Sequence, residues 1–318
     1  MPAELPRGET VRRLIVIAIW LGAALGLGPL GDRLVPDEMK VKVAYQTFQM
    51  ACQVGTLVLG LGAALLLLRR RRDALGLATL PTLPRLAGTI ASVPIVFVVS
   101  CYVALQIALP TLLEELRTRG AGASQQNAGA FGRALTQSPL LVTLLWGALL
   151  AGIGEELFFR GVLWSTITDV TKRFAPGGAP PPEGQPPSLR DRALALLLEG
   201  GIATVLCAAL FGYMHKDLPG GVGIVRFWST TLLGFASGIV RHRTGGVIAC
   251  VVLHSLYNTL VIGNGQKWFG DPRKEAPILE GVPNTMVAFA VAGLVAWGVI
   301  AFVQALKERR ARSAFVAD

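Results

Sequence analysis

Long uninterrupted stretches of apolar residues, separated by short polar or proline-rich segments, make up most of this chain of 318 residues. A helix needs about 20 consecutive apolar residues to cross the hydrocarbon core of a bilayer, and several of the stretches reach that length. We therefore predict an all-α fold, a polytopic transmembrane bundle of about eight helices. The predicted helices cover residues 14–30, 43–68, 86–110, 140–164, a fifth stretch that ends at 211–215, and 227–240, 246–262 and 285–306.

Two segments between the predicted helices break this pattern. Residues 118–137 are rich in glycine, alanine and amide side chains, which is typical of a solvated connection. Residues 175–187 are rich in proline and glycine and cannot form a regular helix, because proline lacks the N–H donor and clashes with the preceding turn. We interpret residues 1–318 as a single membrane domain with a Pro/Gly-rich loop at 175–187.

Composition and charge agree with residence in a membrane. The chain is 52% hydrophobic and only 16% charged, which excludes an ordinary soluble domain. Its net charge of +10 does not indicate a nucleic acid partner, because the basic residues cluster at the ends of apolar stretches, as at 69–72 and 307–312. With eight crossings both termini lie on the side that carries most basic residues, and the positive-inside rule makes that side the cytoplasm. The abundance of arginine, alanine and glycine indicates a bacterium with a GC-rich genome, so we expect the bacterial inner membrane.

The fourth predicted helix carries three charged residues, Glu155, Glu156 and Arg160. A charged side chain at the centre of a bilayer costs about 2.5 to 3.5 kcal/mol on insertion scales, so these residues need compensation. Glu156 and Arg160 are four residues apart and share a helix face, so we predict an ion pair between them. Glu155 has no such partner in its own helix and is available as a general base that acts on water. The alternative is that both glutamates only hold helices together.

Two of the three histidines also lie within apolar stretches. Phe211 and His215 are four residues apart, as are His254 and Asn258, so each pair projects from one face of its helix. Two imidazoles, an amide and a glutamate pair within the membrane indicate a functional site.

The depth of His215 poses a problem for this site. A fifth helix that begins at Ala193 carries His215 to its far end, too deep to meet Glu155. The Glu199-Gly200-Gly201 triplet removes the conflict if the crossing begins near it, and residues 193–198 then lie at the membrane interface.

Three patterns carry a resemblance to a known family. In their order and spacing, Glu-Glu-x-x-x-Arg at 155–160, Phe-x-x-x-His at 211–215 and His-x-x-x-Asn at 254–258 resemble the motifs of the CAAX protease and bacteriocin-processing (CPBP, or Abi) intramembrane proteases. This family includes the endopeptidase that trims prenylated CAAX proteins. The resemblance covers residues 140–262, which we interpret as the catalytic core. It implies an endopeptidase that hydrolyses a peptide bond of a membrane-embedded or membrane-anchored protein or peptide.

The resemblance also implies a role for each matching residue. Glu155 activates the attacking water, His215 helps to hold that water, and His254 with Asn258 stabilises the tetrahedral oxyanion. The supporting residues are Glu156, Arg160 and Phe211.

The resemblance leaves the use of a metal open. We expect no cofactor, because a metal-free glutamate mechanism is the favoured description of a family that was long described as metal-dependent. A zinc ion bound by Glu155, His215 and His254 stays an alternative, since the same side chains serve either mechanism. The chain has no His-Glu-x-x-His motif.

Two other functions compete with proteolysis. A non-catalytic membrane scaffold or bacteriocin-immunity protein of the same fold does not need the complete polar set, which this chain retains. A proton-coupled transporter with a Glu–His relay would often show paired broken helices, whereas the sequence indicates one break, at 218–223. The partners we expect are the lipid bilayer and a membrane protein or peptide substrate, but no nucleic acid. Prenylated CAAX substrates are not expected in a bacterium.

Overall fold

The computed structural model describes residues 7–34, 43–69, 71–119, 139–173, 189–216, 218–270, 278–279 and 282–317. These residues are almost entirely helical, and the described ranges contain one isolated β-bridge, between Leu279 and Val282. The long helices are α1 (Arg7–Leu34), α2 (Val43–Leu67), α4 (Leu83–Arg119), α10 (Ile202–Met214), α11 (Gly220–Thr244), α12 (Ile248–Gly265) and α13 (Asn284–Ala317). The shorter segments are α3 (Arg71–Ala74), α6 (Leu140–Thr143), η2 (Leu144–Leu150), α7 (Ala151–Glu156), η3 (Leu157–Leu163), α8 (Trp164–Arg173), α9 (Leu189–Leu196) and η4 (Leu197–Gly201).

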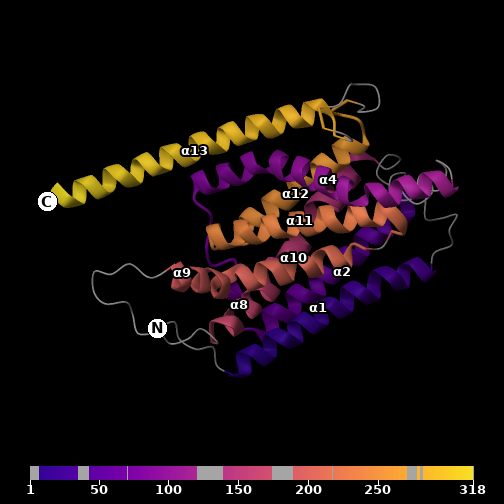
Figure 1. The fold of residues 1–318 in the computed structure, drawn as a ribbon. Helices are drawn as coiled ribbons and strands as arrows, with labels where there is room; N and C mark the ends of the chain where they lie inside the picture. The colour runs from indigo at the N-terminus through magenta and orange to yellow at the C-terminus, as the bar shows by residue number, and fades with distance from the viewer. Residues whose placement is uncertain are drawn as a thin grey trace.

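Within the described ranges, eight helical segments are long and apolar enough to cross a membrane. This confirms the predicted all-α, polytopic bundle, and the protein is an integral membrane protein. Figure 1 shows the long helices side by side, with α1 along one edge of the bundle and α13 along the opposite edge. Large apolar side chains face outwards, among them Leu66 and Phe302, which are 83% and 64% exposed. Such a surface suits lipid tails, which are as apolar as the side chains they touch.

Several helices extend beyond their predicted ends, among them the third and the last. The third predicted helix ends at residue 110, whereas α4 continues through Pro94 and Pro110 to Arg119. Proline is tolerated within membrane helices because neighbouring groups satisfy the backbone that it leaves unpaired. The last helix was predicted to end at 306 and instead reaches Ala317. The predicted loop at 175–187 lies outside the described residues, as does most of the predicted connection at 118–137.

The fourth membrane span is not a uniform α-helix. Its π-helical segments η2 and η3 lie on either side of α7, the short α-helix that ends with Glu155 and Glu156. In a π-helix each N–H bonds five residues back, so the side chains that follow are rotated relative to those of an α-helix. Such segments are rare and often occur at functional sites. The segments η2 and η3 therefore change the direction in which the side chains of Glu155 and Glu156 point.

The fifth span is bent where the sequence suggested that the crossing begins. Gly200 has non-helical dihedral angles (φ 169°, ψ −12°), and α10 starts two residues later, at Ile202. The 13 residues of α10 rise by about 20 Å, roughly two thirds of a 30 Å hydrocarbon core. His215, directly after α10, therefore lies at the level of α7 and not beyond it.

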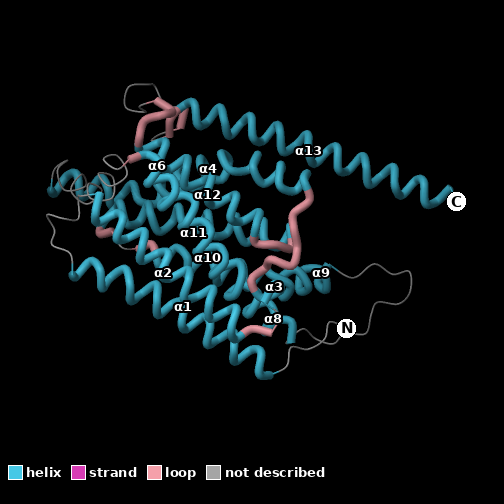
Figure 2. The backbone as a smooth tube through the Cα atoms, turned by 180° about the vertical axis from the view of Figure 1, so that it is seen from behind, coloured by secondary structure: helices cyan, strands magenta, loops and turns pink. Residues whose placement is uncertain are grey.

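One end of the bundle gathers positive charge. Figure 2, drawn from behind, shows α3 and the loop between α3 and α4 across this end. The loop is fixed to α11 and α12, because the N–H of Val247 donates to the carbonyl of Gly76 at 2.9 Å. We call it the basic end, and its described basic side chains include Arg12, Arg13, Arg71, Arg72, Arg85, Lys172, Arg173, Arg241 and Arg243.

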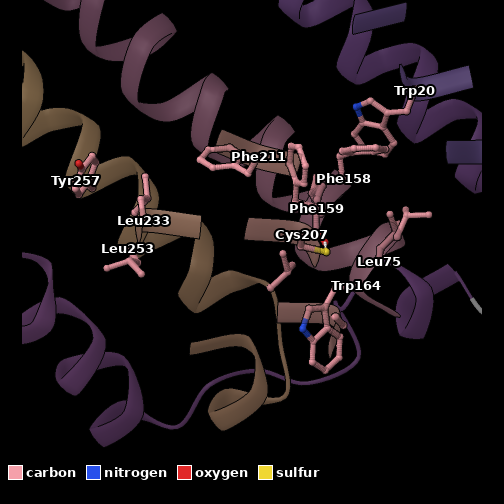
Figure 3. Close-up of a cluster of buried hydrophobic side chains, with 14 of the residues drawn as sticks. Trp20, Leu75, Phe158, Phe159, Trp164, Cys207, Phe211, Leu233, Leu253 and Tyr257 are labelled. Carbon is pink, nitrogen blue, oxygen red and sulfur yellow. Dashed lines mark hydrogen bonds between the residues drawn. The ribbon is translucent and has the colours of Figure 1, made fainter. Parts of the chain in front are cut away.

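A chain of aromatic rings joins the first helix to the centre of the bundle. The ring centroids are 5.7 Å apart from Trp20 to Phe158, 4.9 Å from Phe158 to Phe159, and 5.1 Å from Phe159 to Phe211. Figure 3 shows these side chains converging from α1, η3 and α10. The contacts connect α1 through η3 to α10, although α1 carries no recognised motif.

The helix that carries the glutamates makes a close contact with α12 at Gly152. A Cβ atom at this position would lie 2.4 Å from the Ser255 hydroxyl oxygen and 3.2 Å from the Ser255 backbone nitrogen. Only glycine therefore permits this separation between α7 and α12, the two helices that carry Glu155 and His254.

We predict that Gly152→Ala destabilises the protein by about 1 to 3 kcal/mol, because the added methyl group forces the two helices apart. Gly154→Ala is the matched control, since a Cβ at Gly154 meets no atom within 4 Å and alanine is the better helix former. Unfolding of both variants in mixed micelles measures the difference. Equal stability of the two variants would contradict the close contact.

Candidate active site

The predicted ion pair lies at the centre of the bundle. Glu156 and Arg160 are fully buried, and Nη1 of Arg160 donates to Oε1 of Glu156 at 3.1 Å. The other terminal nitrogen of Arg160 donates to the carbonyl of Gly234 at 2.7 Å, and the Ser237 hydroxyl donates to Oε1 of Glu156 at 3.4 Å. The pair predicted within one helix is confirmed, and it also fixes that helix to α11.

Glu155 meets both intramembrane histidines. Its Oε2 atom is 3.8 Å from Nε2 of His215 and 3.8 Å from Nε2 of His254. These distances exceed those of direct hydrogen bonds and suit a water molecule held between the groups. The Oε2 atom is buried and has no hydrogen-bond partner among the described residues. Three residues from three separate helical spans thus present polar atoms to one point.

In each imidazole, the hydrogen bond of Nδ1, on the side away from Glu155, shows which ring nitrogen carries the proton. Nδ1 of His215 lies 2.7 Å from the carbonyl oxygen of Phe211, and a carbonyl only accepts, so Nδ1 carries the proton. Nδ1 of His254 lies 2.9 Å from Oε1 of Glu156, and it likewise donates to that carboxylate. When either ring is neutral, its Nε2 therefore presents a lone pair toward Glu155, and a ring protonated on both nitrogens donates from Nε2 instead.

His254 connects the two glutamates, which the sequence did not reveal. One ring nitrogen contacts Glu156 and the other faces Glu155. Helix periodicity relates residues of one helix only, so it paired Glu156 with Arg160 and gave no sign of the histidine. Ser237 was missed for the same reason, because no motif marks it.

Phe211 supports both imidazoles. Its ring lies 4.5 Å from the ring of His215 and 5.5 Å, edge to face, from the ring of His254, measured between centroids. The Arg160 guanidinium carbon lies 5.0 Å from the centre of the same ring. A large buried aromatic side chain thus limits the rotation of both histidines and shields the ion pair from lipid.

Asn258 has a different set of contacts from the other motif residues. Its Nδ2 atom donates to the carbonyl of Gly147, in η2, at 2.8 Å. No described contact joins it to Glu155, His215 or His254. Its role in stabilising an oxyanion stays a prediction.

Like Asn258, two other side chains contact backbone carbonyls of the π-helical segments. The Cys207 thiol contacts the carbonyl of Phe159 at 3.3 Å, and Nε of Arg241 donates to the carbonyl of Arg160 at 2.9 Å. Altered backbone pairing within a membrane helix is tolerated when neighbouring side chains satisfy the freed groups. Side chains of α10, α11 and α12 therefore hold the helix that carries the glutamates in its irregular form.

A cavity of about 290 Å³ opens beside Glu155 and His215. Its opposite wall comes from α1 and α2, including Trp20, Gln53 and Thr56. Arg226 of α11 also lines it. The wall from α1 and α2 was not predicted, because neither helix carries a motif.

We tested whether the site residues fit the alternative zinc ion. Among the described residues, no group of three His, Cys, Asp or Glu side chains is arranged to hold a metal ion. The expectation of a metal-free site stays a prediction, as does the alternative of zinc bound by Glu155, His215 and His254.

We predict that Arg160→Met destabilises the protein by about 3 to 5 kcal/mol, because it leaves a buried carboxylate without its cation. The same substitution in a Glu156→Gln background is expected to cost clearly less, since no buried charge is then left unpaired. A double-mutant cycle on unfolding free energies gives the coupling. Equal costs in the two backgrounds would show that the pair does not stabilise the fold.

We compared the sequence with models of known protein families, with curated proteins and with solved structures. Residues 137–260 match the family model described as type II CAAX prenyl endopeptidase Rce1-like, within the CPBP family. A search of curated proteins and a search of solved structures each found no match. The matched segment contains Glu155, His215, His254 and Asn258, so the resemblance seen in the three motifs is confirmed. Over residues 137–260 the chain is therefore similar to the Rce1-like CPBP intramembrane proteases.

Proposed function

We propose that this protein is an intramembrane endopeptidase that hydrolyses a peptide bond of a membrane-embedded or membrane-anchored protein or peptide. One observation carries the proposal: the buried Oε2 of Glu155 has no hydrogen-bond partner among the described residues and faces Nε2 of two histidines at 3.8 Å, beside a cavity. An unpaired carboxylate is costly in a membrane helix, which marks it as functional.

In the proposed first step, Glu155 acts as the general base. A water molecule between Glu155 and His215 donates one proton to Oε2 and the other to the Nε2 lone pair of His215. The water oxygen then attacks the carbonyl carbon of the peptide bond, and Glu155 takes its proton. General base catalysis of this kind contributes about 10²- to 10⁴-fold to a rate.

The tetrahedral oxyanion needs a donor, and His254 can supply one. With a proton on both nitrogens, His254 donates Nδ1–H to Glu156 and Nε2–H toward the oxyanion. His254 is proposed to hold both protons before the attack, when His254, Arg160 and the carboxylates of Glu155 and Glu156 sum to zero charge, which lowers the cost of the cluster within the bilayer. Protonation of Glu155 offsets the charge of the oxyanion, so the sum stays at zero during the reaction. Asn258 is proposed as the second donor, which requires its amide to turn from the carbonyl of Gly147.

The reaction ends with cleavage of the carbon–nitrogen bond. Protonated Glu155 returns its proton to the leaving nitrogen, so that the acid product gains the water oxygen and the amine product gains hydrogen. The aromatic rings of Trp20, Phe158 and Phe159 limit the entry of further water beside the site.

The substrate is proposed to lie between α7 and the wall of α1 and α2. The buried side-chain oxygen of Gln53 has no hydrogen-bond partner among the described residues and lines this cavity with Glu155. It suits an N–H donor from the backbone of an extended substrate. We further propose a bacterial inner membrane, with the basic end and both termini in the cytoplasm.

The proposal predicts that Glu155→Gln lowers the cleavage rate by at least about 100-fold and leaves the protein folded and inserted. Purified protein is incubated with a library of membrane peptides, and mass spectrometry of the fragments gives the bond cleaved. Glu114→Gln is the matched control, because Glu114 is exposed near the end of α4. Unchanged processing by Glu155→Gln would favour a non-catalytic scaffold of the same fold.

A second prediction concerns metal. Cleavage by purified protein is expected to be unchanged after dialysis against a strong chelator, because no step above uses a metal ion. The assay compares initial rates before dialysis, after dialysis and after addition of zinc. Loss of activity on dialysis and its return with zinc would replace the proposed mechanism by a zinc-dependent one.

A further inference from the structure

A second groove lies between α4, α11 and α13. Its volume is about 540 Å³, and it shares no lining residue with the cavity beside Glu155. Arg85 and Arg243 line one end of it, while Val96, Leu253 and Trp297 line other parts. The groove therefore joins a positively charged mouth to an apolar body.

The hydroxyl groups inside the groove do not require a polar occupant. The Thr89 hydroxyl donates to the carbonyl of Arg85 at 2.9 Å, and the Ser92 hydroxyl donates to the carbonyl of Thr89 at 2.7 Å. Both donors are thus satisfied within α4. The charge that an occupant must match comes from the two arginines.

The groove has the depth of one membrane leaflet. Arg85 lies in the first turn of α4, and the rise from Arg85 to Val96 is about 16 Å at 1.5 Å per residue. Half of a hydrocarbon core of about 30 Å is about 15 Å. The lining of α4 thus extends from the interface to the middle of the bilayer.

The arginines lie at the level of lipid headgroups. Arg243 is in the last turn of α11, at the basic end, and both Arg85 and Arg243 are exposed. Basic pockets between transmembrane helices bind anionic headgroups. A free anion gains nothing from the apolar body of the groove, and a parallel second copy of the chain would bring its own basic end against these arginines.

We propose that this groove binds one anionic phospholipid. Its phosphate lies between Arg85 and Arg243, and an acyl chain packs against Val96, Leu253 and Trp297. Leu253 directly precedes His254, so the bound chain supports the wall behind the histidine that contacts both glutamates. The ligand is thus a structural lipid of the leaflet at the basic end.

Native mass spectrometry of the purified full chain tests the proposal. The protein in detergent is titrated with phosphatidylglycerol and, separately, with phosphatidylcholine of the same acyl chains. Wild type is expected to retain phosphatidylglycerol more strongly. Arg85→Gln with Arg243→Gln is expected to weaken that binding by roughly 10- to 30-fold and to leave phosphatidylcholine unaffected.

The matched control is Arg12→Gln with Lys172→Gln, which removes two charges from the same end of the bundle but outside the groove. This control is expected to bind phosphatidylglycerol as wild type does. A third variant, Ala301→Trp, places a large side chain in the groove and is expected to displace both lipids.

Three outcomes would overturn the proposal: equal binding of the two lipids by wild type, equal losses in the two double variants, or displacement of the lipid by millimolar inorganic phosphate. The readout is the mass of the bound lipid, so it does not depend on peptide hydrolysis. Failure of the lipid site and failure of the proposed protease activity are therefore distinguishable.

Discussion

The buried carboxylate of Glu156 is the constraint on which the arrangement of this protein depends. A fully buried charge within a bilayer persists only if donors from the protein replace water, and here one oxygen accepts from Arg160, His254 and Ser237. These donors come from the helix of Glu156 itself, from α12 and from α11. Satisfying a single carboxylate therefore fixes the rotation and the depth of three helices relative to one another.

The adjacent Glu155 has a different environment, because the nearby hydrogen-bond donors contact Glu156. Glu156 is held by three side chains, while Oε2 of Glu155 has no hydrogen-bond partner in the described part of the chain and faces two imidazole nitrogens at 3.8 Å. The irregular backbone on both sides of α7 contributes to this separation of roles, since Cys207, Arg241 and Asn258 each contact one of its carbonyls. In the proposed function, structural charge and reactive charge are thus divided between two consecutive residues.

The parts of the chain outside residues 137–260 supply the surroundings of the site. Helices α1 and α2 close one side of the cavity, and the aromatic contact from Trp20 to Phe158 joins them to the helix of the glutamates. On another side of the bundle, α4 and α13 form the walls of the groove that ends in Arg85 and Arg243. In the proposed function the three motifs carry the chemistry, while access for substrate and contact with lipid depend on helices without a motif.

The sequence by itself determined the eight membrane helices, because the thickness of a bilayer requires apolar runs of a minimum length. It also determined the pairing of Glu156 with Arg160, since residues four apart share a helix face. The depth of His215 indicated that the fifth crossing begins near Gly200, where the structure has a bend. Only the tertiary structure decided that His254 contacts both glutamates, that Asn258 binds the carbonyl of Gly147, and that α1 and α2 line the cavity. These contacts join different helices, and a uniformly apolar helix does not encode its own rotation or depth relative to its neighbours.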